Sequence, residues 1–182
     1  MNETIRADLF RYYQHDYSIV RLLLGLRSRA FRYLFFKRLS NRYSVRTPHG
    51  FVYKIMERHY SHKFGFQIEG QIGKGFYIGH FGTIVVNKEA RLGNNCNIAP
   101  GVTIGETSRG ENAGVPTIGD YVWIGTNAVV VGKITIGSNV LIAPGAYVNF
   151  DVPTHSIVLG NPGKIISREN PTEGYIRFCL PD

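Results

Sequence analysis

The residues of this chain best able to move a proton near neutral pH are its six histidines. Five of them lie either in the first 62 residues or, as His155, behind the last copy of a repeat that fills the middle of the chain. His80 lies inside that repeat, two residues after an aliphatic position and directly before the repeat slips by two residues. A neutral imidazole there can accept a proton from a hydroxyl and pass it to a leaving group. The alternative at this stage is an ordinary surface histidine in a turn.

Thiol and metal chemistry have little support in the sequence. The two cysteines, Cys96 and Cys179, are too few for a disulfide framework or a cysteine-ligated zinc site. A zinc site made of histidines needs about three, and the repeat has one. We therefore expect no metal, and we interpret Cys96 as a small buried apolar residue.

The repeat around His80 has a period of six residues. Small or β-branched residues recur four positions after each member of a series of aliphatic residues, which is Ile118, Ile124, Val130, Ile136, Ile142 and Val148. The same pattern precedes this block from Ile72 to Ile104, and glycine follows many of the aliphatic positions. A helix needs a period of about 3.6 and a flat strand a period of about 2, so neither explains the spacing.

A strand of about four residues and a tight turn of about two explain a six-residue period, and three such units close a triangular coil. We predict stacked coils of parallel strands over residues 65–168, with the aliphatic residues pointing inward and the glycines supplying positive φ at the turns. Eight extra residues between Ile104 and Ile118 predict a protruding loop at 106–117. Residues 169–182 are interpreted as a C-terminal tail.

The positive charge of the chain is concentrated before the repeat. Residues 1–64 hold 13 basic and 4 acidic residues, whereas residues 65–182 hold 8 basic and 9 acidic residues. The first segment is rich in Leu, Phe and Tyr, which predicts two or three helices with a break at Arg46–Gly50. These helices either cover the first open coil or make weak peripheral contact with an anionic membrane. No groove-reading motif accompanies the basic residues, so we expect no nucleic-acid partner.

The hydropathy pattern argues against membrane-spanning and secreted proteins. The apolar runs, such as Leu22–Leu24 followed by Gly25 and Leu26, are far shorter than the roughly 18 residues that a membrane span requires. The first residues include Glu3 and Asp8 and lack the apolar region of a secretory signal. We therefore expect a cytoplasmic protein, with the inner face of the membrane as the alternative location.

Four segments of the repeat region carry a resemblance to a known family: GFYIGHFGTIVVN, NIAPGVTIG, YVWIGTNAVVVGKITIGSNV and VPTHSIVLGNPGKII. They resemble the hexapeptide-repeat acyltransferases, and among these the serine acetyltransferase branch, closest to its exopolysaccharide and capsule O-acetyltransferases. The resemblance implies an all-β left-handed parallel β-helix with a short N-terminal α-helical segment. It further implies a homotrimer with acetyl-CoA in the groove between adjacent β-helices. His80 then occupies the place of the catalytic base that helps an acceptor hydroxyl attack the thioester.

The same resemblance implies further site residues. The family pairs its base with an aspartate about fifteen residues earlier, and the counterpart here falls near Gln67 or Glu69. Glu69 is the better candidate because a carboxylate fixes the histidine tautomer, and an exposed strand-end glutamate is the alternative. The residues implied for acetyl-CoA are small or lie in the GNPGKI segment: Thr126, Asn127, Ala143, Gly145 and Lys164. Small side chains let pantetheine approach the backbone, and a lysine suits the phosphates.

The acceptor is inferred from what this chain lacks. Serine-using members of the resembled family carry an aspartate directly before the catalytic histidine and an Arg-His pair before the proline of the extended loop. This chain has Gly79 and Gly114-Val115 there, so the groups that hold a zwitterion are missing.

Aromatic residues that flank the hexads offer apolar faces for a sugar ring: Phe76, Tyr77, Phe81, Tyr121 and Trp123. Among these we take Tyr77, Phe81 and Trp123 as candidate acceptor-binding residues. We therefore predict an acetyl-CoA-dependent O-acetyltransferase that acts on a saccharide hydroxyl of an exopolysaccharide or its precursor. The alternatives are a serine O-acetyltransferase and a β-helix scaffold without catalysis.

Overall fold

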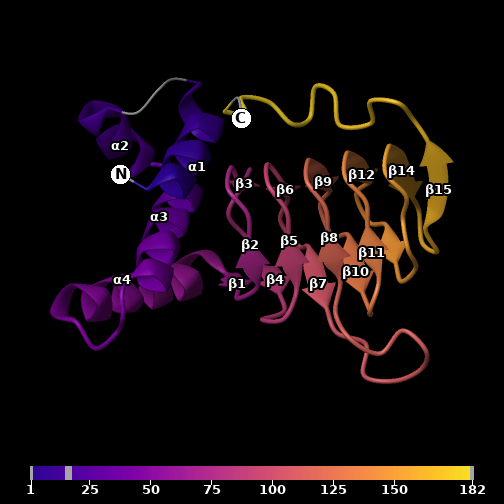
Figure 1. Ribbon diagram of the computed structural model, residues 1–182, viewed down its shortest axis with the longest axis horizontal. Coiled ribbons are helices and arrows are strands. Elements are labelled where there is room, and N and C mark those ends of the chain that lie inside the picture. The colour runs from indigo at the N-terminus through magenta and orange to yellow at the C-terminus, as the bar shows by residue number, and fades with distance from the viewer. Residues whose placement is uncertain (1, 15–17, 181–182) are drawn as a thin grey trace.

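The computed structural model describes residues 2–14 and 18–180, which form a helical segment followed by a parallel β-solenoid (Figure 1). The described helices are α1 (Glu3–Tyr13), α2 (Ile19–Gly25), α3 (Arg29–Arg42) and α4 (Pro48–Phe64). The sequence predicted two or three helices, whereas the structure describes four. The apolar stretch of the basic segment is divided because Ser18 and Ser28 each cap a new helix within it. The Ser18 and Ser28 side chains accept the backbone N–H groups of Arg21 and Phe31, which satisfies donors that a helix N-terminus leaves free.

A break is present near the predicted Arg46–Gly50, but it lies earlier, at residues 43–47, and Pro48, His49 and Gly50 already belong to α4. Helix α3 ends at Arg42, and Thr47 caps α4 by accepting the N–H of Gly50. Pro48 takes the first position of α4, where its missing N–H costs no hydrogen bond.

Three sheets form the sides of the solenoid (Figure 1). The first side contains β1 (Phe66–Ile68), β4 (Ile84–Val86), β7 (Thr103–Gly105), β10 (Val129–Val131) and β13 (Tyr147–Val148). The second side contains β2 (Gln71–Ile72), β5 (Arg91–Leu92), β8 (Thr117–Ile118) and β11 (Thr135–Ile136). The third side contains β3 (Tyr77–Ile78), β6 (Asn97–Ile98), β9 (Val122–Ile124), β12 (Val140–Ile142) and β14 (Ser156–Leu159), and β15 (Lys164–Ser167) ends it antiparallel to β14. The chain visits the three sides in turn, so the predicted fold class of a parallel β-helix behind a short helical segment is confirmed.

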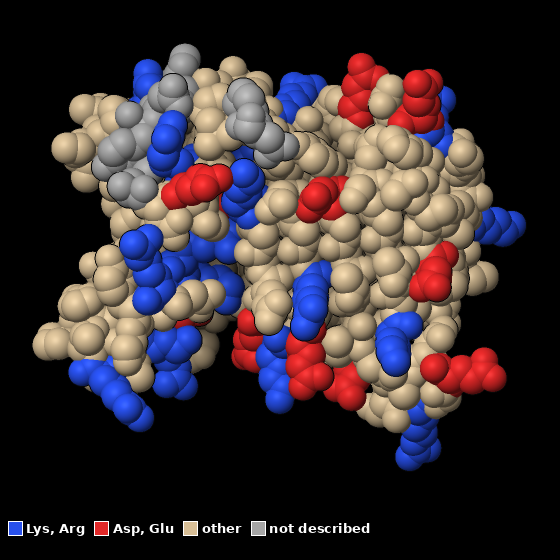
Figure 2. All heavy atoms as spheres, viewed as in Figure 1, with Lys and Arg blue, Asp and Glu red and all other residues tan. Residues whose placement is uncertain are grey.

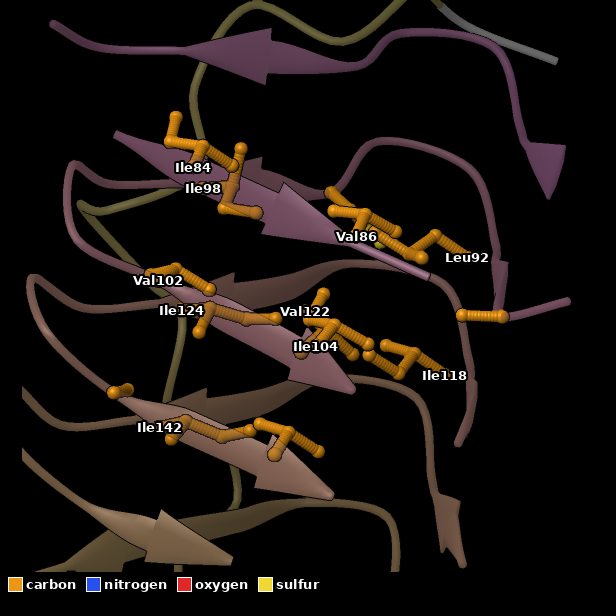
Figure 3. Close-up of a cluster of buried hydrophobic side chains, with 14 of the residues drawn as sticks. Ile84, Val86, Leu92, Ile98, Val102, Ile104, Ile118, Val122, Ile124 and Ile142 are labelled. Atoms are coloured by element: carbon orange, nitrogen blue, oxygen red, sulfur yellow. The ribbon is translucent and has the colours of Figure 1, made fainter. Parts of the chain in front are cut away.

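The aliphatic positions of the hexad point into the solenoid, as predicted. Figure 3 shows Ile98, Ile124 and Ile142 in a column, one from each of three neighbouring coils of the third side. Each of them is at most 2% exposed. Burying one such side chain contributes about 1.5–3 kcal/mol, and the column repeats this contribution in every coil.

The role predicted for the hexad glycines is wrong. Gly93 and Gly119, which directly follow aliphatic positions, do not have positive φ. A Cβ on Gly93 would lie 2.6 Å from the carbonyl carbon of Gly119 in the next coil, so close stacking of the coils excludes a side chain. Positive φ occurs two residues later in the hexad, for example at Gly101 (77°) and Asn127 (59°).

The helices α1, α3 and α4 cover the first coil of the solenoid. Tyr33 of α3 and Phe64 of α4 belong to the same buried cluster as Phe66 of β1. This packing fits the covering role that the sequence left open for the basic segment. Helix α2 instead packs on α1, and Ile19, at 69% exposed, lies on its outer face.

The described part of the C-terminal tail runs back over the third side towards α1 (Figure 1). The ring of Tyr175 lies 4.9 Å from that of Trp123, and the carbonyl of Tyr175 accepts a hydrogen bond from the Asn97 side chain at 3.0 Å. Arg11 of α1 completes the closure by donating from Nε to the carbonyl of Arg177 at 2.8 Å. None of the described helices has the length and apolar character needed to cross a bilayer.

Candidate active site

His80 lies on an edge of the solenoid, in the bend between β3 on the third side and β4 on the first. Its side chain is exposed. Val86 follows Ile78 by eight positions, whereas the hexad has a spacing of six, so the chain bulges outward here. Gly82 allows the bulge with a φ of 148°, and its N–H donates to the carbonyl of Phe64 at 3.2 Å. The slip that the sequence shows is therefore what presents the imidazole to solvent.

The same edge continues through the later coils, and we name it the His80 edge (residues 79–83, 99–102, 125–128 and 143–146). Backbone hydrogen bonds stack these bends on one another. They run from Gly101 N to Thr83 O at 2.7 Å, from Asn127 N to Pro100 O at 3.0 Å and from Gly145 N to Thr126 O at 2.8 Å. Because coils are spaced by about 4.8 Å, the bends with Thr126 and Gly145 lie roughly 10 and 14 Å along the axis from that of His80.

The structure thus places four of the five residues predicted to bind acetyl-CoA on one edge with His80. Thr126, Asn127 and Gly145 are exposed, and Ala143 is half-buried. A Cβ on Gly145 would meet no atom within 4 Å, so this part of the edge has open space above the backbone. The fifth, Lys164, is exposed on β15 and pairs with Leu159 of β14, one step beyond the last bend. Their role in binding remains a prediction.

No hydrogen bond or ion pair joins Glu69 or Gln67 to His80 among the described residues. Both line a cavity of about 880 Å³ where α3 and α4 meet the first side, and His80 does not line it. Burial lowers the pKa of Lys37, which lines the same cavity, and the charges of Glu57 and, less strongly, Glu69 oppose this shift. Within residues 2–14 and 18–180, no hydrogen bond ends on His80. Orientation of His80 by Glu69 therefore stays a prediction.

Three of the aromatic residues that the sequence offers for a sugar ring pack against other residues of this chain instead of facing outward. Phe76 is fully buried in the core, so its predicted outward position is wrong. The ring of Tyr77 lies 4.6 Å from that of Tyr12, and Trp123 packs against Tyr175 of the tail. An acceptor role for Tyr77 and Trp123 stays a prediction.

Phe81 differs from the other candidate aromatic residues because its ring is 52% exposed. The guanidinium carbon of Arg29 lies 4.3 Å from the centre of that ring. Sequence reasoning missed Arg29 because it lies in the helical segment, and nothing in its local sequence points to the bend after β3.

The electrostatics of the neighbouring buried groups favour no second proton carrier. Burial raises the pKa of the Tyr12 hydroxyl well above its usual range, and this hydroxyl donates to the carbonyl of Ile78. Burial likewise raises the pKa of the Cys96 thiol to about 12, which keeps it protonated. Among the described residues no group of His, Cys, Asp and Glu side chains is arranged to hold a metal ion. Among the residues that define the His80 edge, His80 is the one with an ionisable side chain.

Comparison with known proteins identifies relatives that share this fold and sequence pattern. Residues 116–149 match the family model for the bacterial transferase hexapeptide with six repeats. The Neisseria gonorrhoeae serine acetyltransferase, solved in complex with serine, is 31% identical, with a TM-score of 0.68 over 89% of this chain and 67% of that chain. The chain belongs to the bacterial hexapeptide-repeat transferase family.

Two curated relatives carry two kinds of name. Serine acetyltransferase of Staphylococcus xylosus is 39% identical over 64 residues, which is 35% of this chain and 30% of that protein. The putative colanic acid biosynthesis acetyltransferase WcaB of Escherichia coli K12 is 37% identical over 73 residues, or 39% of this chain and 44% of that protein. The matches therefore span less than half the length of these two curated relatives.

A further hexapeptide-repeat structure, the serine acetyltransferase of Brucella abortus in complex with coenzyme A, is 26% identical with a TM-score of 0.71. It covers 91% of this chain and 67% of that chain, so the similarity includes the helical segment as well as the solenoid. The family resemblance inferred from the four repeat segments is confirmed.

Proposed function

We propose that this protein is an acetyl-CoA-dependent O-acetyltransferase that transfers acetyl to a saccharide hydroxyl in a ternary complex. The observation that carries the proposal is the His80 edge, on which one exposed imidazole is followed by three coils of small, accessible residues. Serine acetyltransferases and WcaB are relatives by name, which supports acetyl transfer as the reaction.

His80 performs the proton transfers in the proposed mechanism. Acetyl-CoA supplies an activated acetyl thioester when it is bound. The imidazole of His80 takes the proton from the acceptor hydroxyl as the oxygen attacks the acetyl carbonyl, and it then gives this proton to the departing sulfur. The exposed bend lets two substrates approach this imidazole from solvent.

Small residues of the His80 edge suit a long, flexible donor. We propose that Thr126, Asn127, Ala143 and Gly145 hold the pantetheine arm and that Lys164 meets a phosphate. The roughly 14 Å from the His80 bend to that of Gly145 suits an extended chain lying along the edge. The Brucella abortus relative is described as a complex with coenzyme A, in line with this donor.

A homotrimer accords with the open edge and with the loop that protrudes from another edge. The loop of residues 106–117 leaves the solenoid between β7 and β8, and residues 108–113 are exposed (Figure 1). We propose, as the resemblance implies, that a neighbouring copy completes the acetyl-CoA groove.

The proposal of a saccharide acceptor is based on Gly79 and Gly114-Val115. These residues offer neither a carboxylate for the ammonium group of serine nor a cation for its carboxylate. We expect purified protein to use saccharide hydroxyls with a higher kcat/KM than free L-serine, by about 10-fold or more for each missing charged hydrogen bond. Release of coenzyme A measured across a panel of mono- and oligosaccharides and L-serine tests this expectation.

The matched control in that panel is the background hydrolysis of acetyl-CoA without an acceptor. A kcat/KM for L-serine above that for every saccharide would favour the serine O-acetyltransferase alternative, to which several named relatives belong. Failure to bind acetyl-CoA at all would favour a scaffold without catalysis.

Helix α2 supports a location at the inner face of a membrane. Its apolar residues Ile19, Val20, Leu23 and Leu24 are 42–69% exposed, and they belong to the segment with 13 basic and 4 acidic residues. Figure 2 shows Lys and Arg side chains gathered over the helical end of this face of the molecule. We propose that α2 contacts an anionic bilayer weakly, because an apolar helix face among cations matches that surface.

We expect the protein to co-sediment with vesicles that contain anionic lipid at low salt and to dissociate at physiological salt. Leu23→Asp should abolish the binding, whereas Ile55→Asp, which places the same charge on the exposed face of α4, serves as the control. Absence of binding under every condition would leave α2 without a membrane role.

A further inference from the structure

Arg29 and Phe81 form a contact beside His80 that the proposed mechanism does not use. The guanidinium carbon of Arg29 lies 4.3 Å from the centre of the Phe81 ring. Phe81 directly follows His80, so the guanidinium lies no more than about 12 Å from the His80 Cα, given a spacing of about 3.8 Å between neighbouring Cα atoms. A monosaccharide that carries one charged group spans such a separation.

The position of Arg29 is fixed by its neighbours in the helix. It is the first residue of α3, after the Ser28 cap, and Ala30 and Phe31 behind it are buried at 5% and 0% exposure. The guanidinium rests on an aromatic face while its N–H groups remain in its own plane. This arrangement holds a cation in place without consuming its donors.

Arg29 has no anionic partner among the residues that the structure describes. Arg38 is tied to Asp8, and Arg11 donates to the carbonyls of Gly75 and Arg177, but no hydrogen bond or ion pair ends on the Arg29 guanidinium. Both Arg29 and Phe81 are exposed. A surface cation–π contact contributes little to stability, so the pair is more useful as a binding surface than as a support.

We propose that Arg29, supported by Phe81, is a subsite for an oxyanion of the acceptor, a phosphate or a carboxylate, and that it orients the reacting hydroxyl towards His80. This inference rests on the proposed function and refines its acceptor from a saccharide to an anionic saccharide. An arginine fork binds both oxyanions through paired hydrogen bonds.

The phosphates of coenzyme A are a poor fit for this subsite. The predicted donor residues begin at Thr126 and continue away from the helices, towards the C-terminal end of the solenoid. Arg29 lies on the opposite side of His80, where α3 covers the first coil. In this proposal donor and oxyanion therefore approach the imidazole from opposite directions along the axis, which lets both be bound at once.

The test measures binding by calorimetry to protein saturated with coenzyme A. The probes are D-glucose 1-phosphate, D-glucuronate, D-glucose and L-serine, and the proteins are the wild type, Arg29→Gln and the control Arg91→Gln. Arg91 is an exposed arginine of β5 on the second side. We expect the wild type to bind one of the two anionic sugars more tightly than glucose, and Arg29→Gln to weaken that binding by about 10- to 100-fold.

The control variant Arg91→Gln should bind the same sugar as tightly as the wild type. Equal affinity of the wild type and Arg29→Gln, equal weakening by Arg91→Gln, or no binding of either anionic sugar at millimolar concentration would overturn the subsite. Tighter binding of D-glucose 1-phosphate would indicate a phosphate subsite, and tighter binding of D-glucuronate would indicate a carboxylate subsite. If L-serine is the one probe whose binding depends on Arg29, the subsite binds the carboxylate of an amino acid, and the proposal of a saccharide acceptor is wrong.

Acetyl transfer is measured in parallel so that two failures can be told apart. With the preferred anionic sugar as acceptor, Arg29→Gln should raise KM by a larger factor than it lowers kcat, because Arg29 binds a part of the acceptor that does not react. Arginine-dependent binding without any transfer would refute the proposed function while the subsite stands. Transfer with a kcat and KM that Arg29→Gln leaves unchanged would refute the subsite while the function stands.

Discussion

Replacing His80 with alanine is expected to lower kcat by about 10²- to 10⁴-fold, the usual contribution of a positioned general base. The KM for acetyl-CoA should change little, because the proposed donor residues lie in later coils. The thermal unfolding midpoint should also be unchanged, since His80 is exposed and no hydrogen bond ends on it among the described residues. Release of coenzyme A with the best saccharide acceptor measures the rate.

A second histidine provides the control for this experiment. His59 is exposed on α4 and is not among the residues that define the His80 edge, so His59→Ala should retain the wild-type rate. A His80→Ala protein that keeps more than about a third of the wild-type rate would exclude His80 from the mechanism.

The coiled architecture could be predicted because its signal is local and repeated. Residues such as Ile124 and Ile142 occupy equivalent places in successive coils. The need for a buried aliphatic side chain therefore recurs in the sequence every six residues. The slip after Ile78 could be recognised for the same reason, since it interrupts a regular count. His80 was found from sequence because it lies at this interruption.

The surroundings of His80 could not be predicted in this way, because they depend on contacts between distant segments. Trp123 directly precedes a hexad position, so the sequence suggests that it is accessible, yet Tyr175 of the tail packs against it. The path of the tail follows no repeat and could not be predicted from the sequence. Glu69 is near the expected separation from His80 but lines the cavity under α4. The glycine error has a related cause, since Gly119 is required by the neighbouring coil rather than by its own φ.

A buried ion pair contributes to the attachment of the helices to the solenoid. Arg38 of α3 donates from Nε to Asp8 of α1 at 2.8 Å, and its other nitrogens donate to the carbonyls of Ile72 and Gly73 at 2.6 Å each. Asp8 also accepts the N–H of Phe76 at 2.9 Å. The side chains of Asp8 and Arg38 are 1% and 9% exposed, so the pair joins two helices and the first coil out of reach of water.

Asp8→Ala is therefore expected to lower the free energy of unfolding by about 3–5 kcal/mol, because it leaves the Arg38 charge buried without a counter-ion. Urea unfolding at a fixed protein concentration measures the change. Glu3→Ala is the matched control, since Glu3 also joins α1 to the first coil, through Lys74 at 2.9 Å, but its side chain is 74% exposed. Loss of that surface pair should cost at most about 1 kcal/mol.

A double variant separates the charge from the packing. Asp8→Leu combined with Arg38→Met removes both charges and keeps apolar volume, so it should recover most of the stability that Asp8→Ala loses. Recovery would assign the loss to the isolated guanidinium of Arg38 rather than to the shape of the junction. An Asp8→Ala protein no less stable than Glu3→Ala would show that other contacts, such as those of Tyr33 and Phe64, hold the helices on the first coil without this pair.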